Sequence, residues 1–159
     1  MDRLKGKVAL ISGGARGQGS AEAQLFAAEG AFVVVGDILD IEGKETVRRI
    51  NESGGSAKYV HLDVTSKDDW DSAVVETIDS FGKMDVLVNN AGITLNRTVA
   101  ETTVDEWDKV NEINQQEGVW RTYHVGEKVL LESYGLSTVG TVVQHSMSDK
   151  TRVRILLDF

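Results

Sequence analysis

The sequence predicts an α/β protein in which helices cover an open, doubly wound sheet of parallel strands. In the first hundred residues, short apolar runs rich in Val and Ile alternate with helical patterns, which is typical of such a sheet. The first run leads directly into a glycine-rich turn at residues 13–19, and a helical pattern follows. With 159 residues, of which 41% are hydrophobic, the chain has the size and apolar content of one domain over residues 1–159.

The apolar runs are expected to be buried strands because they are short, rich in Val and Ile, and bounded by glycine. The expected strands are residues 7–12, 31–36, 59–62 and 86–88. The expected helices between them are residues 20–29, 42–51 and 66–81. Ser66 opens the third helix, whose apolar face is formed by Trp70, Val74, Ile78 and Phe81. This succession places four strands before residue 89.

The pattern becomes less regular after residue 104, and the composition changes after about residue 115. An apolar stripe of Trp107, Val110 and Ile113 predicts one more helix, and a second helical stretch is expected around residues 119–130. Residues 140–145 and 152–157 are expected to be strands. Residues 1–115 therefore predict the main sheet, and residues 116–159 form a divergent tail.

Charge and composition exclude several classes of protein. The chain has 25 acidic and 17 basic residues, and the net charge of −8 argues against nucleic-acid or anionic-membrane partners. It has no cysteine, which excludes disulfides and thiolate chemistry, and its three histidines are too scattered to predict a metal site. No stretch has the roughly 20 apolar residues of a membrane span, and no signal peptide is recognised. We expect a cytoplasmic protein.

The turn at residues 13–19 follows a strand and precedes a helix, as a pyrophosphate-binding turn does. Glycine lets the backbone approach a phosphate closely, and the N–H groups of the next helix favour its charge. Asp37 ends the next strand, 18 residues after Gly19, near the spacing of a ribose-binding acid. Either feature alone also occurs in ordinary loops, but together they favour a dinucleotide site. No Gly-Lys-Ser or Gly-Lys-Thr of a P-loop is present.

Motifs in register over residues 4–92 resemble those of the short-chain dehydrogenase/reductase family. Residues 12–19 (SGGARGQG) resemble its glycine motif, with Ser12 where threonine is usual. Residues 61–65 (HLDVT) resemble its adenine-binding turn, and residues 89–92 (NNAG) match the motif that follows its fourth strand. Residues 106–114 (EWDKVNEIN) match more loosely. The resemblance implies a Rossmann-like sheet in strand order 3-2-1-4-5 and hydride transfer between a nicotinamide and an alcohol or ketone.

The resemblance also implies roles for individual residues. It places Gly13, Arg16, Gln18 and Gly19 around the pyrophosphate, Asp37 at the adenosine ribose, and Asp63 and Val64 beside adenine. Asn90 would hold the loop beside the nicotinamide ribose. The resemblance gives Asn114 a structural and catalytic role and places Ser146 near the catalytic serine. The carboxylate of Asp37 repels a 2′-phosphate, so NAD is the expected cofactor.

One departure from the family concerns its catalytic Tyr-x-x-x-Lys pair. The three tyrosines are followed four positions later by Asp63, Glu127 and Thr138, none of which is lysine. General acid-base catalysis by that pair is therefore not expected in this chain. Two hypotheses stay open: an NAD-dependent dehydrogenase, or a catalytically incomplete NAD-binding module or truncated fragment.

The tail allows two interpretations. In the first, residues 118–132 form the family's long helix and residues 140–145 its fifth parallel strand, so that the sheet is truncated at about this point. In the second, residues 123–159 form a separate small β module with three strands. The resemblance favours the first. It also implies a homo-oligomer, built on the helices expected within residues 104–132.

Overall fold

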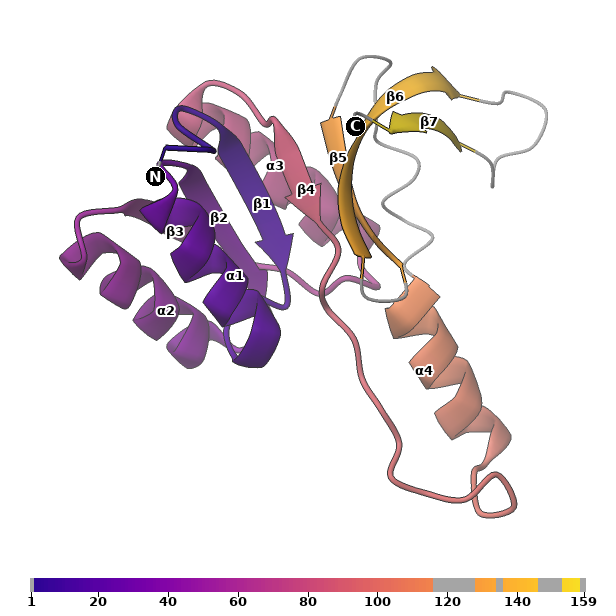
Figure 1. Ribbon diagram of the computed structural model, residues 1–159. Helices are drawn as coiled ribbons and strands as arrows, with labels where there is room; N and C mark the ends of the chain where they lie inside the picture. Colours follow the sequence, from indigo (N-terminus) through magenta and orange to yellow (C-terminus); the bar gives the residue numbers. More distant parts are fainter. Residues whose placement is uncertain (1, 116–127, 134–135, 146–152, 158–159) are drawn as a thin grey trace.

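The computed structural model describes residues 2–115 with their side chains and, beyond them, the backbone of residues 128–133, 136–145 and 153–157. Within these residues, one sheet of seven strands has the order β3-β2-β1-β4-β5-β6-β7 (Figure 1). The strands are β1 (Val8–Ser12), β2 (Phe32–Asp37), β3 (Ser56–His61), β4 (Val86–Val88), β5 (Lys128–Ser133), β6 (Leu136–His145) and β7 (Val153–Leu157). The helices are α1 (Gly17–Ala28), α2 (Asp40–Glu52), α3 (Lys67–Phe81) and α4 (Val104–Gln115).

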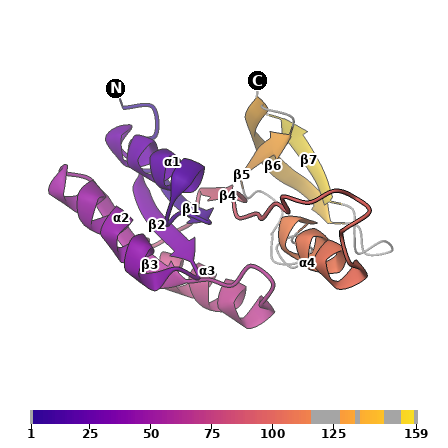
Figure 2. The ribbon, with the colours of Figure 1, turned by 90° about the horizontal axis from the view of Figure 1, so that it is seen from below.

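The strands β1 to β4 pair in parallel, which confirms the predicted α/β sheet and its order 3-2-1-4. Every residue of β1 is buried, because helices cover both faces of the strand. Figure 2 shows α1 and α3 on opposite sides of β1 and β2. One apolar cluster joins Leu10 and Val34 to Trp70 of α3, and the other joins Ile11 and Val33 to α1 and α2.

Three helix boundaries show how local sequence sets the elements. The Ser66 side chain accepts a hydrogen bond from the backbone N–H of Asp69 and begins α3, as expected. Gly82 ends that helix in the left-handed conformation, with φ of 78°. Helix α1 begins at Gly17, three residues earlier than expected, and takes the last glycines of the turn into its first turn. Its buried residues Gly19, Ser20 and Ala23 are small and fit against the sheet.

The tail differs from the favoured interpretation. Residues 128–132, expected within a helix, belong to β5 (Lys128–Ser133), which pairs in parallel with β4 at Val88 and Leu130. Residues 140–145, expected as a parallel fifth strand, belong to β6, which is antiparallel to β5. A short apolar run fits a helix or a strand equally well, and the unpaired edge of β4 favours the strand. The rest of the expected helix, residues 118–127, lies outside the described residues.

The three strands of the alternative interpretation are present at about the expected places, and β7 pairs with β6 in antiparallel fashion. They extend the edge of the main sheet through β4 rather than standing apart from it. The division of the chain into domains stays a prediction.

Helix α4 forms where the stripe of Trp107, Val110 and Ile113 predicts it, but it lies away from α1, α2 and α3 at the end of an extended segment (Figure 1). None of its residues is fully buried, and the Trp107 side chain is 62% exposed. In the described part of the chain, no helix is long and apolar enough to cross a membrane.

Candidate functional site

A cleft of about 420 Å³ lies at the carboxyl ends of β1, β2, β3 and β4. The strand order reverses there, since β1 has β2 on one side and β4 on the other. The eight residues expected around a cofactor all line it: Gly13, Arg16, Gln18, Gly19, Asp37, Asp63, Val64 and Asn90. The fold therefore brings together four segments that are far apart in the sequence.

The glycines of the turn are required by close contacts. A Cβ on Gly19 would lie 2.3 Å from the carbonyl oxygen of Gly13 and 2.4 Å from Nδ2 of Asn90. Gly13 has a positive φ of 65°, and a Cβ there would lie 2.8 Å from Cα of Ala91. Side chains at these two positions would collide with the segment after β4, which packs directly against the glycine turn.

The segment after β4 supports the turn through Asn90. Its Nδ2 donates to the carbonyl oxygens of Ser12, at 3.0 Å, and Gly13, at 3.1 Å. In return, Oγ of Ser12 accepts from the backbone N–H groups of Asn90 and Ala91, both at 3.1 Å. A serine makes these contacts as well as a threonine would, which accounts for this departure from the family motif.

The start of α1 presents donors to the cleft. The Arg16 side chain does not cap the helix, although Arg16 occupies the N-cap position, and the first turn of α1 contains no acidic residue. Unpaired N–H groups at a helix N-terminus attract anions. The exposed Arg16 lines the same cleft and adds a positive charge. This end of the cleft is suited to a phosphate group.

Asp37 is held by main-chain hydrogen bonds at the end of β2. It is 9% exposed. Its Oδ2 accepts from the N–H of Ala15 at 2.9 Å, and its Oδ1 accepts from the N–H of Leu39 at 3.0 Å. Each carboxylate oxygen can accept a further hydrogen bond, and the two backbone donors fix the orientation of the carboxylate.

The glycine turn is also fixed from the side of α2. Oγ1 of Thr46 donates to the carbonyl oxygen of Ala15 at 2.9 Å and lies 2.9 Å from Oγ of Ser20. All three residues are buried, so these bonds are shielded from water. They connect α1, α2 and the turn into one unit.

Asp63 and Val64 form the wall of the cleft after β3. Oδ1 of Asp63 accepts from the backbone N–H of Thr65 at 2.9 Å and from its hydroxyl at 2.7 Å. These bonds lower the pKa of the Asp63 carboxyl, chiefly through the Thr65 hydroxyl. The carbonyl oxygen of Val64 accepts from Nε1 of Trp70 at 2.9 Å, which anchors the turn to the core.

The two residues with an expected catalytic role are placed differently. Asn114, near the end of α4, forms hydrogen bonds with the main chain of Ile93, and Ile93 lines the cleft. Ser146 lies outside the described residues. Among the described residues, no group of three or more His, Asp or Glu side chains is arranged to hold a metal ion.

Seven further residues of the cleft had no predicted role at the cofactor, although Leu62, Ala91 and Gly92 belong to the motifs quoted above. The seven are Ile38, Leu39, Leu62, Ala91, Gly92, Ile93 and Ile113. Most are direct neighbours of the motif residues, and their position after a strand end was the signal that would have found them.

The fold and the cleft define a Rossmann-like protein, and the sequence comparison places it in a family. The chain belongs to the short-chain dehydrogenase family, which it matches over residues 7–147. It is 46% identical over 119 residues to a trans-4-hydroxycyclohexanecarboxylate dehydrogenase of Sinomonas cyclohexanicum, covering 71% of this chain and 46% of that protein. It is 36% identical over 146 residues to a cyclopentanol dehydrogenase of Comamonas sp., covering 92% of this chain and 56% of that protein.

A third relative is a 3-alpha-(or 20-beta)-hydroxysteroid dehydrogenase of Mycobacterium bovis, 47% identical over 112 residues, with coverage of 70% of this chain and 42% of that protein. The chain thus spans about half the length of the curated relatives it matches. Among solved structures, a dehydrogenase/reductase from Sinorhizobium meliloti 1021 matches with a TM-score of 0.67 and 36% identity, covering 70% of this chain and 44% of that one. A short-chain dehydrogenase/reductase mutant of Serratia marcescens matches with a TM-score of 0.70 and 27% identity, covering 79% and 54%.

Proposed function

We propose that the cleft binds NAD(H), with the pyrophosphate at the glycine turn and the adenosine ribose at Asp37. The observation that carries the proposal is the convergence of the turn, the uncapped start of α1 and the fixed carboxylate of Asp37 on one cleft. A Cβ on Gly19 would collide with Gly13 and Asn90, so glycine at this position preserves the tight turn that lines the cleft. The residues present therefore fit the cofactor.

The preference for NAD(H) over NADP(H) rests on the carboxylate of Asp37. A ribose with two free hydroxyls donates hydrogen bonds to a carboxylate, whereas a 2′-phosphate is repelled by it. The N–H groups of Ala15 and Leu39 hold both carboxylate oxygens. Turning the Asp37 side chain away from a 2′-phosphate would break these two hydrogen bonds. Arg16 lines the cleft too, but the proposal assigns it to the pyrophosphate.

The proposed reaction is hydride transfer with a small alcohol or ketone. When bound, NAD(H) accepts or supplies the hydride. The compared relatives are named for alcohols on aliphatic rings, which supports a cyclic secondary alcohol or its ketone as the substrate class. Asn114 and Ser146 keep their proposed roles, with Asn114 acting through Ile93 of the cleft wall.

The alternative is an NAD-binding module without turnover, and the tyrosines favour it. None of the three has a lysine four residues later. Loss of general acid-base assistance reduces a rate by roughly 10²- to 10⁴-fold. With cyclopentanol and NAD as substrates, little or no NADH formation is therefore expected from this chain, even where the cofactor binds.

Isothermal titration with NADH and with NADPH tests the proposal. NADH is expected to bind more tightly than NADPH, and Asp37→Asn is expected to weaken NADH roughly tenfold or more by removing a charge-assisted hydrogen bond. Tighter binding of NADPH contradicts the argument from Asp37, and binding of neither contradicts the cofactor site itself. Turnover of cyclopentanol decides separately between enzyme and binding module.

Two further parts of the proposal concern self-association and location. Self-association through α4 is supported by the exposure of Val104 (74%) and Trp107 (62%), because exposed apolar patches often mark interfaces. A cytoplasmic location rests on the sequence and on the resemblance to the family.

A further inference from the structure

Three polar side chains meet beside the turn that joins β2 to α2. The hydroxyl of Tyr59 lies 2.5 Å from the carbonyl oxygen of Asp37 and 2.6 Å from Oδ1 of Asp40. Nδ1 of His61 lies 2.7 Å from the same Oδ1. Tyr59 and His61 belong to β3, and Asp40 is the first residue of α2. The group therefore connects one strand to both ends of the turn.

The same turn forms part of the cleft wall. Asp37, Ile38 and Leu39 line the cleft, and Asp40 follows them directly. Ile38 is 58% exposed, so its packing does little to hold the turn in place. Among the bonds that hold it are those that Asp37 makes with Ala15 and Leu39, together with the contacts of Tyr59 and His61 from β3.

Gly43 gives independent support for the importance of Tyr59. A Cβ on Gly43 would lie 2.2 Å from Cε2 of the Tyr59 ring and 2.5 Å from Cδ2. Gly43 lies inside α2, where glycine is a poor helix former, and its φ is not among the positive ones. Space for the ring, rather than a special backbone conformation, therefore accounts for glycine at this position.

We propose that Tyr59, His61 and Asp40 form a clamp that positions the turn after β2 for the adenosine half of the dinucleotide. The proposal rests on the proposed function, because it assumes that the cleft binds NAD(H). The three are positioning residues. The Tyr59 hydroxyl contacts the carbonyl oxygen of Asp37 and Oδ1 of Asp40, and Nδ1 of His61 contacts the same Oδ1. The clamp keeps the Asp37 carboxylate and Ile38 in place before the cofactor arrives, which reduces the entropy lost on binding.

His61 makes the clamp dependent on pH. It faces Asp40 of α2 and Asp69 of α3, whose Oδ2 lies 4.0 Å from Nε2, and it feels the charge of Asp63. The hydrogen bond to His61 is the largest cause of a lowered pKa at Asp40, and the charge of Lys44, whose Nζ lies 5.7 Å from the centre of the Tyr59 ring, lowers it further. The hydrogen bond to Asp40 is the largest cause of a raised pKa at His61. The imidazolium therefore persists above the pH at which a free histidine loses its charge, and its bond to Asp40 weakens when the proton leaves.

Titration calorimetry with NADH, at several pH values from about 6.5 to 9, tests the clamp. We expect Tyr59→Phe to weaken NADH binding about two- to tenfold at every pH, because it removes a hydrogen bond without removing charge. We expect His61→Gln to weaken NADH binding at the lower pH values only, and so to flatten the dependence of NADH affinity on pH. A residue needed only for folding would not change the shape of that dependence.

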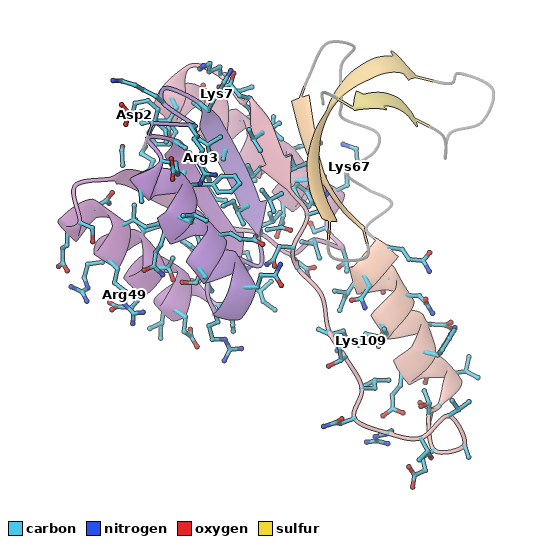
Figure 3. The ribbon with its side chains drawn as sticks, in the orientation of Figure 1. Asp2, Arg3, Lys7, Arg49, Lys67 and Lys109 are labelled. Carbon is cyan, nitrogen blue, oxygen red and sulfur yellow. The ribbon has the colours of Figure 1, made fainter. Side chains whose placement is uncertain are left out.

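Arg49→Gln is the matched control. Arg49 lies on the outer side of α2, as Figure 3 shows, and its Nε donates to Oε1 of Glu45 at 2.9 Å. The substitution removes an exposed ion pair within α2 and leaves the turn after β2 unchanged. NADH binding by Arg49→Gln should therefore equal that of the unaltered chain. The His61 side chain is 56% exposed, so His61→Gln keeps the fold and the test stays decisive even if Tyr59→Phe does not fold.

The outcomes separate the two proposals. If the unaltered chain binds no NADH at any pH, the proposed function fails, and the clamp fails with it. If the unaltered chain binds NADH and both clamp variants behave like Arg49→Gln, the clamp alone is overturned.

Discussion

The side-chain amide of Asn114 pairs with the main chain of Ile93, 21 residues earlier. Oδ1 of Asn114 accepts from the N–H of Ile93 at 2.9 Å, and Nδ2 donates to its carbonyl oxygen at 3.0 Å. Ile93 follows the segment that supports the glycine turn and lines the cleft. The last turn of α4 is thereby attached to the wall of the candidate site, although the start of that helix lies far from it (Figure 1).

Asn114→Ala should weaken NADH binding several-fold, because both bonds to Ile93 are lost and each is worth about 0.5–1.5 kcal/mol. Asn111→Ala is the matched control, since Nδ2 of Asn111 donates to the carbonyl oxygen of Trp107 within the same helix. Calorimetric titration of both variants checks the prediction. Equal binding by the two variants would show that the contact with Ile93 does not matter to the cleft.

Asn90→Ala should lower both stability and cofactor affinity. It leaves the carbonyl oxygens of Ser12 and Gly13 without the Asn90 donor, which is expected to reduce the unfolding free energy by about 1–3 kcal/mol. Asn51→Ala removes a comparable pair of bonds, to the main chain of Ala57, at a place remote from the cleft. Urea denaturation should show a loss for both variants, and NADH titration a loss for Asn90→Ala alone.

Gly19→Ala should reduce NADH binding by roughly tenfold or more, because the new Cβ would overlap the carbonyl oxygen of Gly13 and force the turn open. Gly17→Ala separates this collision from backbone strain. Gly17 has a positive φ of 55° but nothing within 4 Å of an added Cβ, so a cost of about 1–2 kcal/mol in stability is expected. Retained NADH affinity in Gly19→Ala would show that NADH binding does not depend on the close packing of Gly19 against Gly13.

The raised pKa of His61 predicts a dependence of stability on pH. A basic group with a higher pKa in the folded state stabilises the fold fully below its unfolded pKa, about 6.5, and this contribution is lost as the pH rises through the higher folded value. The difference in unfolding free energy between the unaltered chain and His61→Gln should therefore shrink as the pH rises from below 6.5. Urea denaturation at several pH values measures it. A difference that grows with pH would have the wrong sign.

Trp107→Glu should reduce self-association. The Trp107 side chain is 62% exposed, so the charge is not expected to disturb folding and should act at an interface. Lys109→Gln, on the same helix (Figure 3), lowers the net charge by the same amount and is the control for the change in charge. Sedimentation equilibrium at micromolar concentration should show dimers or larger species for the unaltered chain and a shift toward monomer for Trp107→Glu. A monomeric unaltered chain would contradict the proposal.

Much of the main sheet follows from the sequence because the relevant forces are local. The buried run of β1, the Ser66 cap and Gly82 at the end of α3 each specify structure through patterns a few residues long. The glycine turn is recognisable for the same reason, since it lies between a strand and a helix. Asp37 was predicted from its place at the end of the second strand, 18 residues after Gly19.

Relationships between distant residues required the tertiary structure. Tyr59 and Asp40 have no pattern that links them, and His61 by itself resembles an ordinary turn residue; only the pairing of β3 with β2 brings the three together. Residues 128–133 are a strand rather than a helix because β4 offers an unpaired edge, which the sequence does not display. Local pattern thus determined β1 to β4 and the glycine turn, while contacts between distant segments decided β5 and the environment of Asp37.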